Sequence, residues 1–228
     1  MIATAKHRFR LIVFDCDGTL VDSQHMIVAA MAAAWRSLDL PEPDPAAVRR
    51  VVGLTLEQAM AALRPDADER LVARLAAAYR REAVAQRQRE DYREPLFPGI
   101  REALDAIDGP DVLFGIATGK NRRGLLHTLA QHGLADRFVT LQTADRAPSK
   151  PHPAMLHQAM DEAGADPGST VLIGDTSFDM EMALNARTAA IGAGWGYHAP
   201  DELVRAGAGR VIASPAELPA VLATYGER

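Results

Sequence analysis

Four consecutive apolar residues, Leu11–Phe14, run directly into two aspartates, Asp15 and Asp17. A continuous apolar run of this length is typical of a strand that is buried on both faces of a parallel sheet. Side chains alternate along a strand, so we expect Asp15 and Asp17 on the same side and Cys16 facing away from them. The sequence therefore predicts a buried parallel strand that ends at a pair of carboxylates.

The two neighbouring carboxylates allow more than one interpretation. They can hold a hard divalent cation, or they can divide the roles of nucleophile and acid/base between them. Gly18 permits a sharp turn after them, and Thr19 adds a hydroxyl. The alternative is a turn that uses aspartate and glycine for geometry alone, and only the rest of the sequence separates these interpretations.

The composition excludes several classes of protein. The 228 residues, 48% of them hydrophobic, fit one large domain or one domain that carries an insertion. The net charge of −5 argues against a nucleic-acid partner. No apolar segment is long enough to span a bilayer, residues 1–8 lack the pattern of a signal peptide, and the single cysteine excludes an internal disulfide. We therefore expect a cytoplasmic protein with no membrane partner.

Beyond residue 112, expected strands alternate with expected helices. The strands are at 112–117, 138–141, 170–173, 189–192 and 210–213, and the helices are at 122–131, 153–163 and 178–186. This alternation predicts a parallel sheet covered by helices on both faces, to which the strand at 11–14 also belongs. The fold class is thus α/β, with a Rossmann-like parallel-sheet core.

Residues 24–93 have a helical pattern instead, interrupted by proline-rich breakers. Asp44 precedes Pro45 and is expected to cap a helix, and Thr55 with Gln58 has the form of a capping box. We therefore expect an α/β core domain formed by residues 1–22 and 94–228, and an α-helical cap domain, residues 23–93, inserted into it.

Four polar segments lie where ligands of open parallel sheets bind, beyond the carboxyl ends of the strands. They are Asp15 with Asp17, then Thr118–Asn121, Ser149–Pro151 and Gly174–Asp179. A phosphoryl group suits this set, because its oxygens need cations and hydrogen-bond donors that are already in place. Lys150 supplies a charge, Thr118 supplies a donor, and Asp15 with Asp175 offers the hard oxygen ligands that Mg²⁺ prefers.

The motifs Asp15-x-Asp17-Gly18-Thr19, Thr118, Lys150 and Gly174-Asp175-x-x-x-Asp179, in this order, strongly resemble those of the haloacid dehalogenase superfamily. The resemblance covers nearly the whole chain. A dehalogenase of this superfamily would not be expected to keep Asp17, so the resemblance points to the phosphotransferase branch. The helical insertion resembles the small cap of the phosphoglycolate phosphatase-like and β-phosphoglucomutase-like branch.

The resemblance implies a role for each acidic motif residue. Asp15 is the expected nucleophile, which forms an aspartyl-phosphate. Asp17 is the expected general acid/base, and its backbone carbonyl is an expected metal ligand. Asp175 is the expected second metal-binding carboxylate, and Asp179 the expected ligand of metal-bound water.

The resemblance also implies which residues hold the substrate. Thr118, Gly119 and Lys150 are expected to bind the phosphoryl oxygens, and Lys150 also to restrain Asp15. Arg50, or its neighbour Arg49, is expected to clamp a carboxylate or second phosphate, the alternative being a solvated helix end.

Three further expectations concern parts of the sequence outside the catalytic motifs. Ser23 is expected to cap a helix at the cap hinge. The segment Gly194–Tyr197 resembles a loop that shapes the mouth of the site in this branch. Relatives commonly place glycine where Arg187 stands, and a left-handed arginine would cost about 1 kcal/mol, so we expect the preceding helix to end differently.

The expected function is that of a Mg²⁺-dependent phosphomonoesterase, acting on a small phosphorylated metabolite that is phosphoglycolate-like by resemblance. A β-phosphoglucomutase-like phosphomutase is the alternative, followed by a phosphonate or pyrophosphate hydrolase. A phosphonate hydrolase is less favoured, because residues 23–93 contain no lysine that could form a Schiff base. A catalytically inactive binding protein would have lost a motif residue, and none is lost. Both a monomer and a homodimer remain open.

Overall fold

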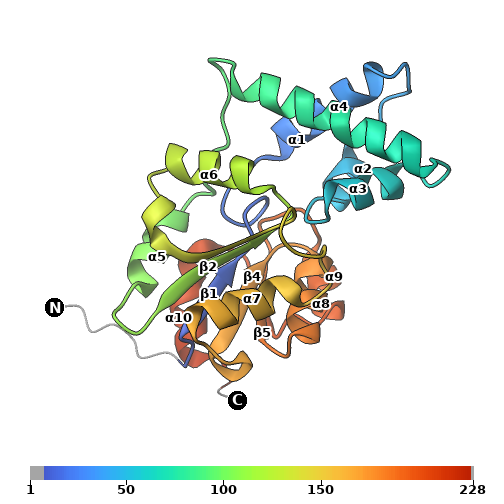
Figure 1. Cartoon of the computed structure of the whole chain (residues 1–228). Coiled ribbons are helices and arrows are strands. Elements are labelled where there is room, and N and C mark those ends of the chain that lie inside the picture. The colour runs from blue at the N-terminus through green and yellow to red at the C-terminus, as the bar shows by residue number, and fades with distance from the viewer. Residues whose placement is uncertain (1–7, 227–228) are drawn as a thin grey trace.

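The protein, described here by a computed structural model for residues 8–226, contains one six-stranded parallel sheet (Figure 1). The strands are β1 (Leu11–Phe14), β2 (Leu113–Thr118), β3 (Phe138–Thr143), β4 (Thr170–Gly174), β5 (Ala189–Ala193) and β6 (Arg210–Ile212). Their order is β3-β2-β1-β4-β5-β6, and every neighbouring pair is parallel. The strand order therefore reverses around β1, which makes its carboxyl end the switch point at which ligands of such sheets bind.

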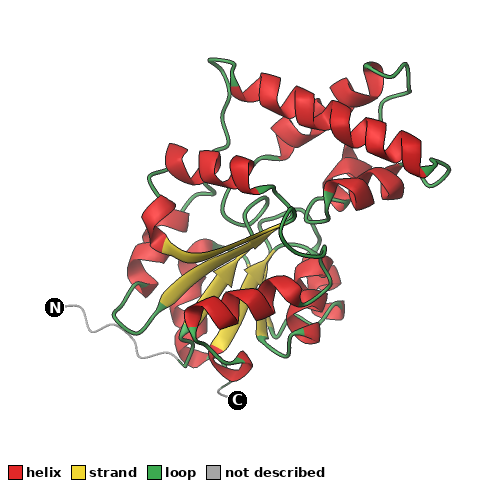
Figure 2. Cartoon of the chain, viewed as in Figure 1, coloured by secondary structure: helices red, strands yellow, loops and turns green. Residues whose placement is uncertain are grey.

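Helices cover both faces of this sheet (Figure 2). One face carries α5 (Ile100–Ile107), α6 (Arg122–Gln131) and α10 (Leu218–Thr224), and the other carries α7 (Ala154–Ala163), α8 (Ser177–Asn185) and α9 (Pro200–Arg205). In β1, Ile12 and Phe14 pack into the first layer while Leu11 and Val13 pack into the second. Both faces of β1 are thus buried, which explains why its sequence is continuously apolar.

The helical insertion stands apart from the sheet (Figure 1). It comprises α1 (Gln24–Arg36), α2 (Pro45–Arg50), α3 (Leu56–Leu63) and α4 (Glu69–Arg87). These helices bury a hydrophobic cluster of their own, which includes Met31, Trp35, Val48, Met60 and Leu75. The chain enters and leaves the insertion side by side, since the Asp22 N–H donates to the Pro95 carbonyl at 2.8 Å. No helix within residues 8–226 is long and apolar enough to cross a membrane.

Two expected helix starts have different outcomes. Asp44 caps α2 as expected, because its Oδ1 accepts a hydrogen bond from the Ala46 N–H at 2.9 Å. The capping box at Thr55 is wrong: the Thr55 side chain caps nothing, although the residue precedes α3. Its N–H instead donates to Ser149 Oγ at 2.8 Å, a contact with the core that replaces the local one.

The expectation for Arg187 is also wrong. This residue adopts the left-handed conformation, with φ of 58°. The N–H groups of Arg187 and Thr188 donate to the carbonyls of Leu184 and Ala183, which is the hydrogen-bond pattern of a Schellman motif. These two bonds satisfy carbonyls at the end of α8 and offset the steric cost of a side chain in this conformation.

Candidate active site

The carboxyl ends of β1, β2 and β4 bring three predicted site residues together. Asp15 follows β1, Thr118 ends β2 and Asp175 follows β4, and all three side chains are buried. The Asp15 N–H donates to the Ile173 carbonyl at 2.9 Å, so the strand pairing continues up to the first carboxylate. Register within the sheet therefore fixes where these side chains begin.

Lys150 is fully buried between two carboxylates. Its Nζ lies 2.9 Å from Asp15 Oδ1 and donates to Asp179 Oδ1 at 2.6 Å. The other oxygen of Asp179 accepts from the N–H and the hydroxyl of Thr176, at 3.1 and 2.6 Å. Burial would lower the pKa of Lys150, but the charges of Asp15 and Asp179 raise it above its usual value. The lysine therefore stays charged and links the end of β1 to α8.

Asp175 is held by the loops around it. Its Oδ1 accepts from the Thr19 hydroxyl at 2.8 Å, and its Oδ2 accepts from the Tyr197 N–H at 2.9 Å. A Cβ at Gly18 or at Gly196 would lie 2.2 or 2.1 Å from atoms of the Asp175 side chain. Only glycine allows this close approach, and Gly18 also has a positive φ of 91°. The loop expected to shape the site mouth thus contacts a predicted metal ligand directly.

The acidic residues fit a divalent cation. Oxygen atoms of Asp15, Asp175 and Asp179 lie within 4.8 Å of one another, and all three residues are buried. Within residues 8–226, Asp15 Oδ2 has no hydrogen-bond partner. Burial raises the pKa of Asp15 to about 7 against the opposing charge of Lys150, and burial with the charges of Asp15 and Asp179 raises that of Asp175 well above its usual value. A bound cation would favour the ionised forms.

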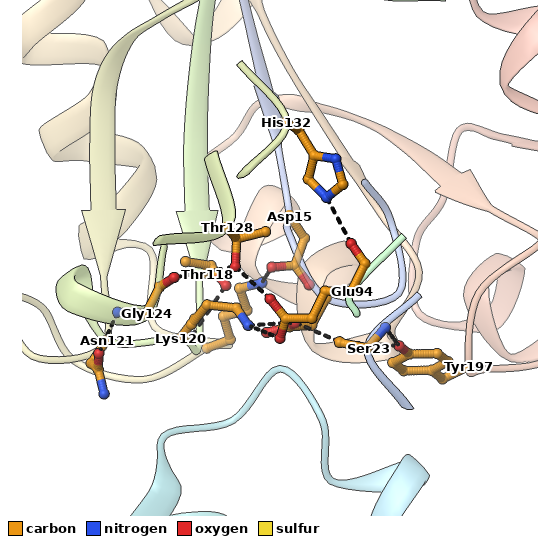
Figure 3. Close-up of polar contacts among 12 residues, drawn as sticks. Asp15, Ser23, Glu94, Thr118, Lys120, Asn121, Gly124, Thr128, His132 and Tyr197 are labelled. Atoms are coloured by element: carbon orange, nitrogen blue, oxygen red, sulfur yellow. Dashed lines mark hydrogen bonds and ion pairs between the residues drawn. The ribbon is translucent and has the colours of Figure 1, made fainter. Parts of the chain in front are cut away.

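A second polar cluster is centred on Lys120, with Glu94, Thr128 and Ser23 around it (Figure 3), and Asp17 belongs to it. Asp17 Oδ1 lies 3.0 Å from Lys120 Nζ, which donates to Glu94 Oε1 at 3.0 Å. Glu94 Oε2 in turn accepts from the Thr128 hydroxyl at 2.6 Å. Burial would lower the pKa of Lys120, but Asp17 and Glu94 raise it well above its usual value. One ammonium group therefore joins the expected acid/base to the segment that returns from the helical insertion.

Ser23 also belongs to this second cluster. It lies at the start of α1 as expected, but its side chain does not cap the helix. Its hydroxyl instead donates to Asp17 Oδ1 at 2.5 Å, and it lies 3.4 Å from the Tyr197 hydroxyl. The local prediction for Ser23 was wrong because a buried carboxylate offers the hydroxyl a charged acceptor.

A cavity of about 510 Å³ lies between the carboxylates and the helical insertion. We call one part of this cavity the floor, and it is lined by Asp15, Asp17, Thr118, Gly119 and Lys120. Lys150 does not line the cavity and reaches the site through its contact with Asp15.

Arg50 neither lines the cavity nor contacts the buried carboxylates. Its Nη1 lies 3.1 Å from Glu202 Oε1 on the surface, so the guanidinium pairs with α9 of the core instead of facing the floor. The family resemblance indicated Arg50 as a substrate-binding residue. Its ion pair with Glu202 could not be seen in the sequence, because the two residues are far apart in the chain.

Sequence reasoning missed the roles of Lys120 and Glu94. Lys120 follows Thr118 by two residues at the end of β2, a position that already indicated the site. Glu94 lies where the chain re-enters the core, and no local pattern marks it. Their partnership is visible only once the fold brings the two segments together.

The chain is similar to several known proteins over most of its length. The family model for haloacid dehalogenase-like hydrolases matches residues 12–193. The chain is 38% identical over 198 residues to "Probable phosphatase IndB" of Dickeya dadantii, covering 85% of this chain and 84% of that protein. It is 31% identical over 222 residues to the N-acetylmuramic acid 6-phosphate phosphatase of Pseudomonas putida, covering 94% and 96%. With the phosphoglycolate phosphatase of Chromobacterium violaceum it shares 31% identity over 220 residues, covering 93% and 96%.

Solved structures show the same fold. A haloacid dehalogenase-like family hydrolase from Streptococcus pneumoniae is 26% identical and superimposes with a TM-score of 0.81, covering 93% of this chain and 98% of that one. A hydrolase from Pseudomonas syringae is 27% identical with a TM-score of 0.82, covering 94% and 98%. With buried acids at the carboxyl ends of β1 and β4 and a family model that spans most of its length, the chain belongs to the haloacid dehalogenase-like hydrolase family.

Proposed function

We propose that this hydrolase is a Mg²⁺-dependent phosphomonoesterase that acts on a small phosphorylated metabolite through an aspartyl-phosphate. The observation that carries the proposal is the buried group of Asp15, Asp175, Asp179 and Lys150, of which Asp15 reaches the cavity floor that Asp17 also lines. The phosphatase names of the three relatives support the same reaction class.

Asp15 and Asp17, the two carboxylates of the cavity floor, each have a proposed role in the reaction. A carboxylate oxygen of Asp15 attacks phosphorus, which forms an acyl phosphate while the ester bond to the leaving group breaks. Asp17 gives a proton to the departing alkoxide and then takes one from the water that attacks phosphorus, which releases phosphate and restores Asp15. The Thr118 hydroxyl and the Gly119 N–H are proposed to bind phosphoryl oxygens.

Asp15, Asp175 and the backbone carbonyl of Asp17 are the proposed metal ligands, with Asp179 binding a metal-bound water. When bound there, Mg²⁺ supplies the charge that lets an anionic carboxylate approach an anionic phosphate. Lys150 stays paired with Asp15 and Asp179 and holds the nucleophile in place.

Residues 23–93 are the proposed cap domain. Their separate hydrophobic cluster and their position above the cavity floor support this division. The segment after α2 already contacts the core, since a Cβ at Gly119 would lie 2.6 Å from the Leu54 carbonyl oxygen. A cap in this position would exclude water from the phosphoryl group.

The resemblance implies a phosphoglycolate-like substrate. The names of the relatives support two kinds of ester, one of a two-carbon acid and one of an amino sugar. A test panel should therefore contain phosphoglycolate, N-acetylmuramic acid 6-phosphate and simple sugar phosphates.

The proposal is tested by phosphate release from this panel with Mg²⁺ and with EDTA. We expect release that requires the metal and that Asp15→Asn lowers by about 10³-fold or more, because the variant has no nucleophilic carboxylate. Asp161→Asn, at an exposed site on α7, is the matched control and should retain activity. A folded, Mg²⁺-loaded wild type that releases no phosphate from any ester would refute the proposal.

A further inference from the structure

The cavity continues from its polar floor into an apolar roof supplied by the helical insertion. The roof consists of Met26, Ile27 and Met31 from α1, Val52 and Leu54 from the segment after α2, and Val84 from α4. Cavities of about 300–1,000 Å³ with mainly apolar walls typically bury most of the surface of a ligand much larger than a two-carbon acid. At about 510 Å³, the cavity is far larger than a two-carbon acid requires.

Two of the cationic residues that line the cavity, Lys120 on its floor and Arg80 on α4, are already paired with carboxylates. Lys120 adjoins Asp17 but lies between that carboxylate and Glu94. Arg80 forms an ion pair with Glu57. In a small phosphorylated acid, the carboxylate lies only a few bonds from phosphorus, so its cation would have to be close to Asp15. The cationic lining residue at that place, Lys120, has two carboxylate partners already, and a further anion there would compete with both.

Two other arginines line the cavity at one edge. Arg123 is exposed in the first turn of α6, and Arg87 Nη2 would lie 3.0 Å from a Cβ at Gly124 in the same turn. They therefore mark the α6 side of the cavity. Polar atoms at the far end of a substrate would meet this edge, while its body would contact the roof.

The aromatic lining fits an uncharged ring. Tyr79, from α4, lines the cavity, and burial raises its pKa to about 12, so it remains a neutral phenol at physiological pH. Its ring offers an apolar face and its hydroxyl offers a hydrogen bond.

From the size of the cavity, its apolar roof and the pairing of Lys120 on its floor with two carboxylates, we infer that the preferred substrates are phosphate monoesters whose alcohol carries an uncharged, ring-sized apolar or aromatic group. Esters of small acids are disfavoured. The inference rests on the proposed phosphatase function and assigns the substrate class of that same site.

The test compares three monoesters: 2-phenylethyl phosphate, ethyl phosphate and phosphoglycolate. The first two release primary alcohols of similar acidity, so a difference in kcat/KM between them reports binding of the ring and not the reactivity of the ester. We expect kcat/KM for 2-phenylethyl phosphate to exceed that for each of the other two by about tenfold or more, the effect of burying a ring in an apolar site.

A matched pair of variants on α4 locates the effect. Ala83 is half-buried and lines the cavity, whereas Ala85, two residues later, is exposed and does not. Ala83→Phe fills the space beside the roof and should lower the ratio of kcat/KM between 2-phenylethyl and ethyl phosphate by about fivefold or more. Ala85→Phe should leave that ratio unchanged. Leu54→Ser, in a loop, removes roof surface without overpacking and should lower the ratio even where Ala83→Phe folds poorly.

Each outcome decides between the two proposals. Phosphate release that depends on Asp15 but shows equal kcat/KM for the three esters, or a preference for phosphoglycolate, overturns the inference and leaves the phosphatase function in place. Equal effects of Ala83→Phe and Ala85→Phe overturn the role of the roof. A Mg²⁺-loaded protein that hydrolyses none of the three esters, nor any ester of the wider panel, removes the function and the inference together.

Discussion

Two lysines with little exposed side chain, Lys150 and Lys120, each bridge a pair of carboxylates in this protein, yet their surroundings differ in charge. Lys150 contacts Asp15 and Asp179, and Asp175 lies close to both. Lys120 contacts Asp17 and Glu94, and hydroxyl groups complete its cluster. The first cluster thus has one carboxylate more than the second around a single ammonium group.

The pKa shifts report this difference. In the Lys150 cluster, burial raises the pKa of Asp15 to about 7 and that of Asp175 well above its usual value. In the Lys120 cluster, burial would raise the pKa of Glu94, but Lys120 and hydrogen bonds lower it below its usual value. The charges of the Lys120 cluster are therefore balanced by its own side chains, whereas the Lys150 cluster can accept an additional positive charge.

Removing Lys150 should have the largest effect. Lys150→Met leaves three buried carboxylates with no cation, and we expect activity to fall by about 10³-fold and the free energy of unfolding by about 3–5 kcal/mol. Phosphate release and urea denaturation measure the two effects. Arg146→Met, at an exposed position nearby in sequence, is the control. A variant with near wild-type activity would show that Lys150 is not needed to hold Asp15.

The second-largest effect should be stabilisation by Mg²⁺, which should depend on the Lys150 cluster and not on the Lys120 cluster. At a concentration about 100 times its Kd, we expect the metal to stabilise the wild type by about 2.7 kcal/mol, measured as a rise in Tm. Asp175→Asn should lose this rise, because it removes a proposed ligand, whereas Glu94→Gln should keep it. An equal rise in Tm for both variants would place the metal elsewhere.

The free energy of unfolding should depend on pH differently in the wild type and in Glu94→Gln. Because folding lowers the pKa of Glu94, its ionised form stabilises the native state above the unfolded pKa, and this contribution is lost as pH falls through the folded pKa. The wild type should therefore exceed Glu94→Gln in unfolding free energy by about 2 kcal/mol at pH 7, and the gap should narrow below about pH 4.5. Glu90→Gln, at an exposed site, should show no such gap.

Arg50→Ala should have the smallest effect. Its ion pair with Glu202 lies on the surface, where such pairs contribute under about 1 kcal/mol. We expect KM to change by less than about twofold, because the guanidinium does not line the cavity. An increase in KM of tenfold or more would mean that Arg50 turns toward bound substrate, as the resemblance implied.

The sequence predicted the core of the fold well, for physical reasons. A run such as Leu11–Phe14 has no amphipathic face and can only be buried on both sides, and the helix at Arg122–Gln131 matches its prediction residue for residue. The sequence did not indicate α5, α9 or α10. These helices have 8, 6 and 7 residues, and α5 was missed although its apolar residues Ile100, Ala103, Leu104 and Ile107 recur at helical spacing.

For the site, the residues predicted at strand ends are those that the structure brings together. These residues lie at strand ends or directly after them, and the position of each strand is indicated by its local apolar sequence. Contacts that depend on tertiary packing were missed, as for Ser23, which binds Asp17 instead of its own helix, and for the pairing of Glu94 with Lys120.

The support of Asp175 by the segment after β5 has a consequence for biosynthesis. The chain acquires all of its acidic motif residues by Asp179, yet the Tyr197 N–H and the glycine that let this segment approach are made later. A nascent or truncated chain that stops before Gly194 would carry every predicted catalytic side chain without the backbone that orients the Asp175 carboxylate. The Asp175 carboxylate therefore gains this support only after the segment that follows β5 has been synthesised and packed against it.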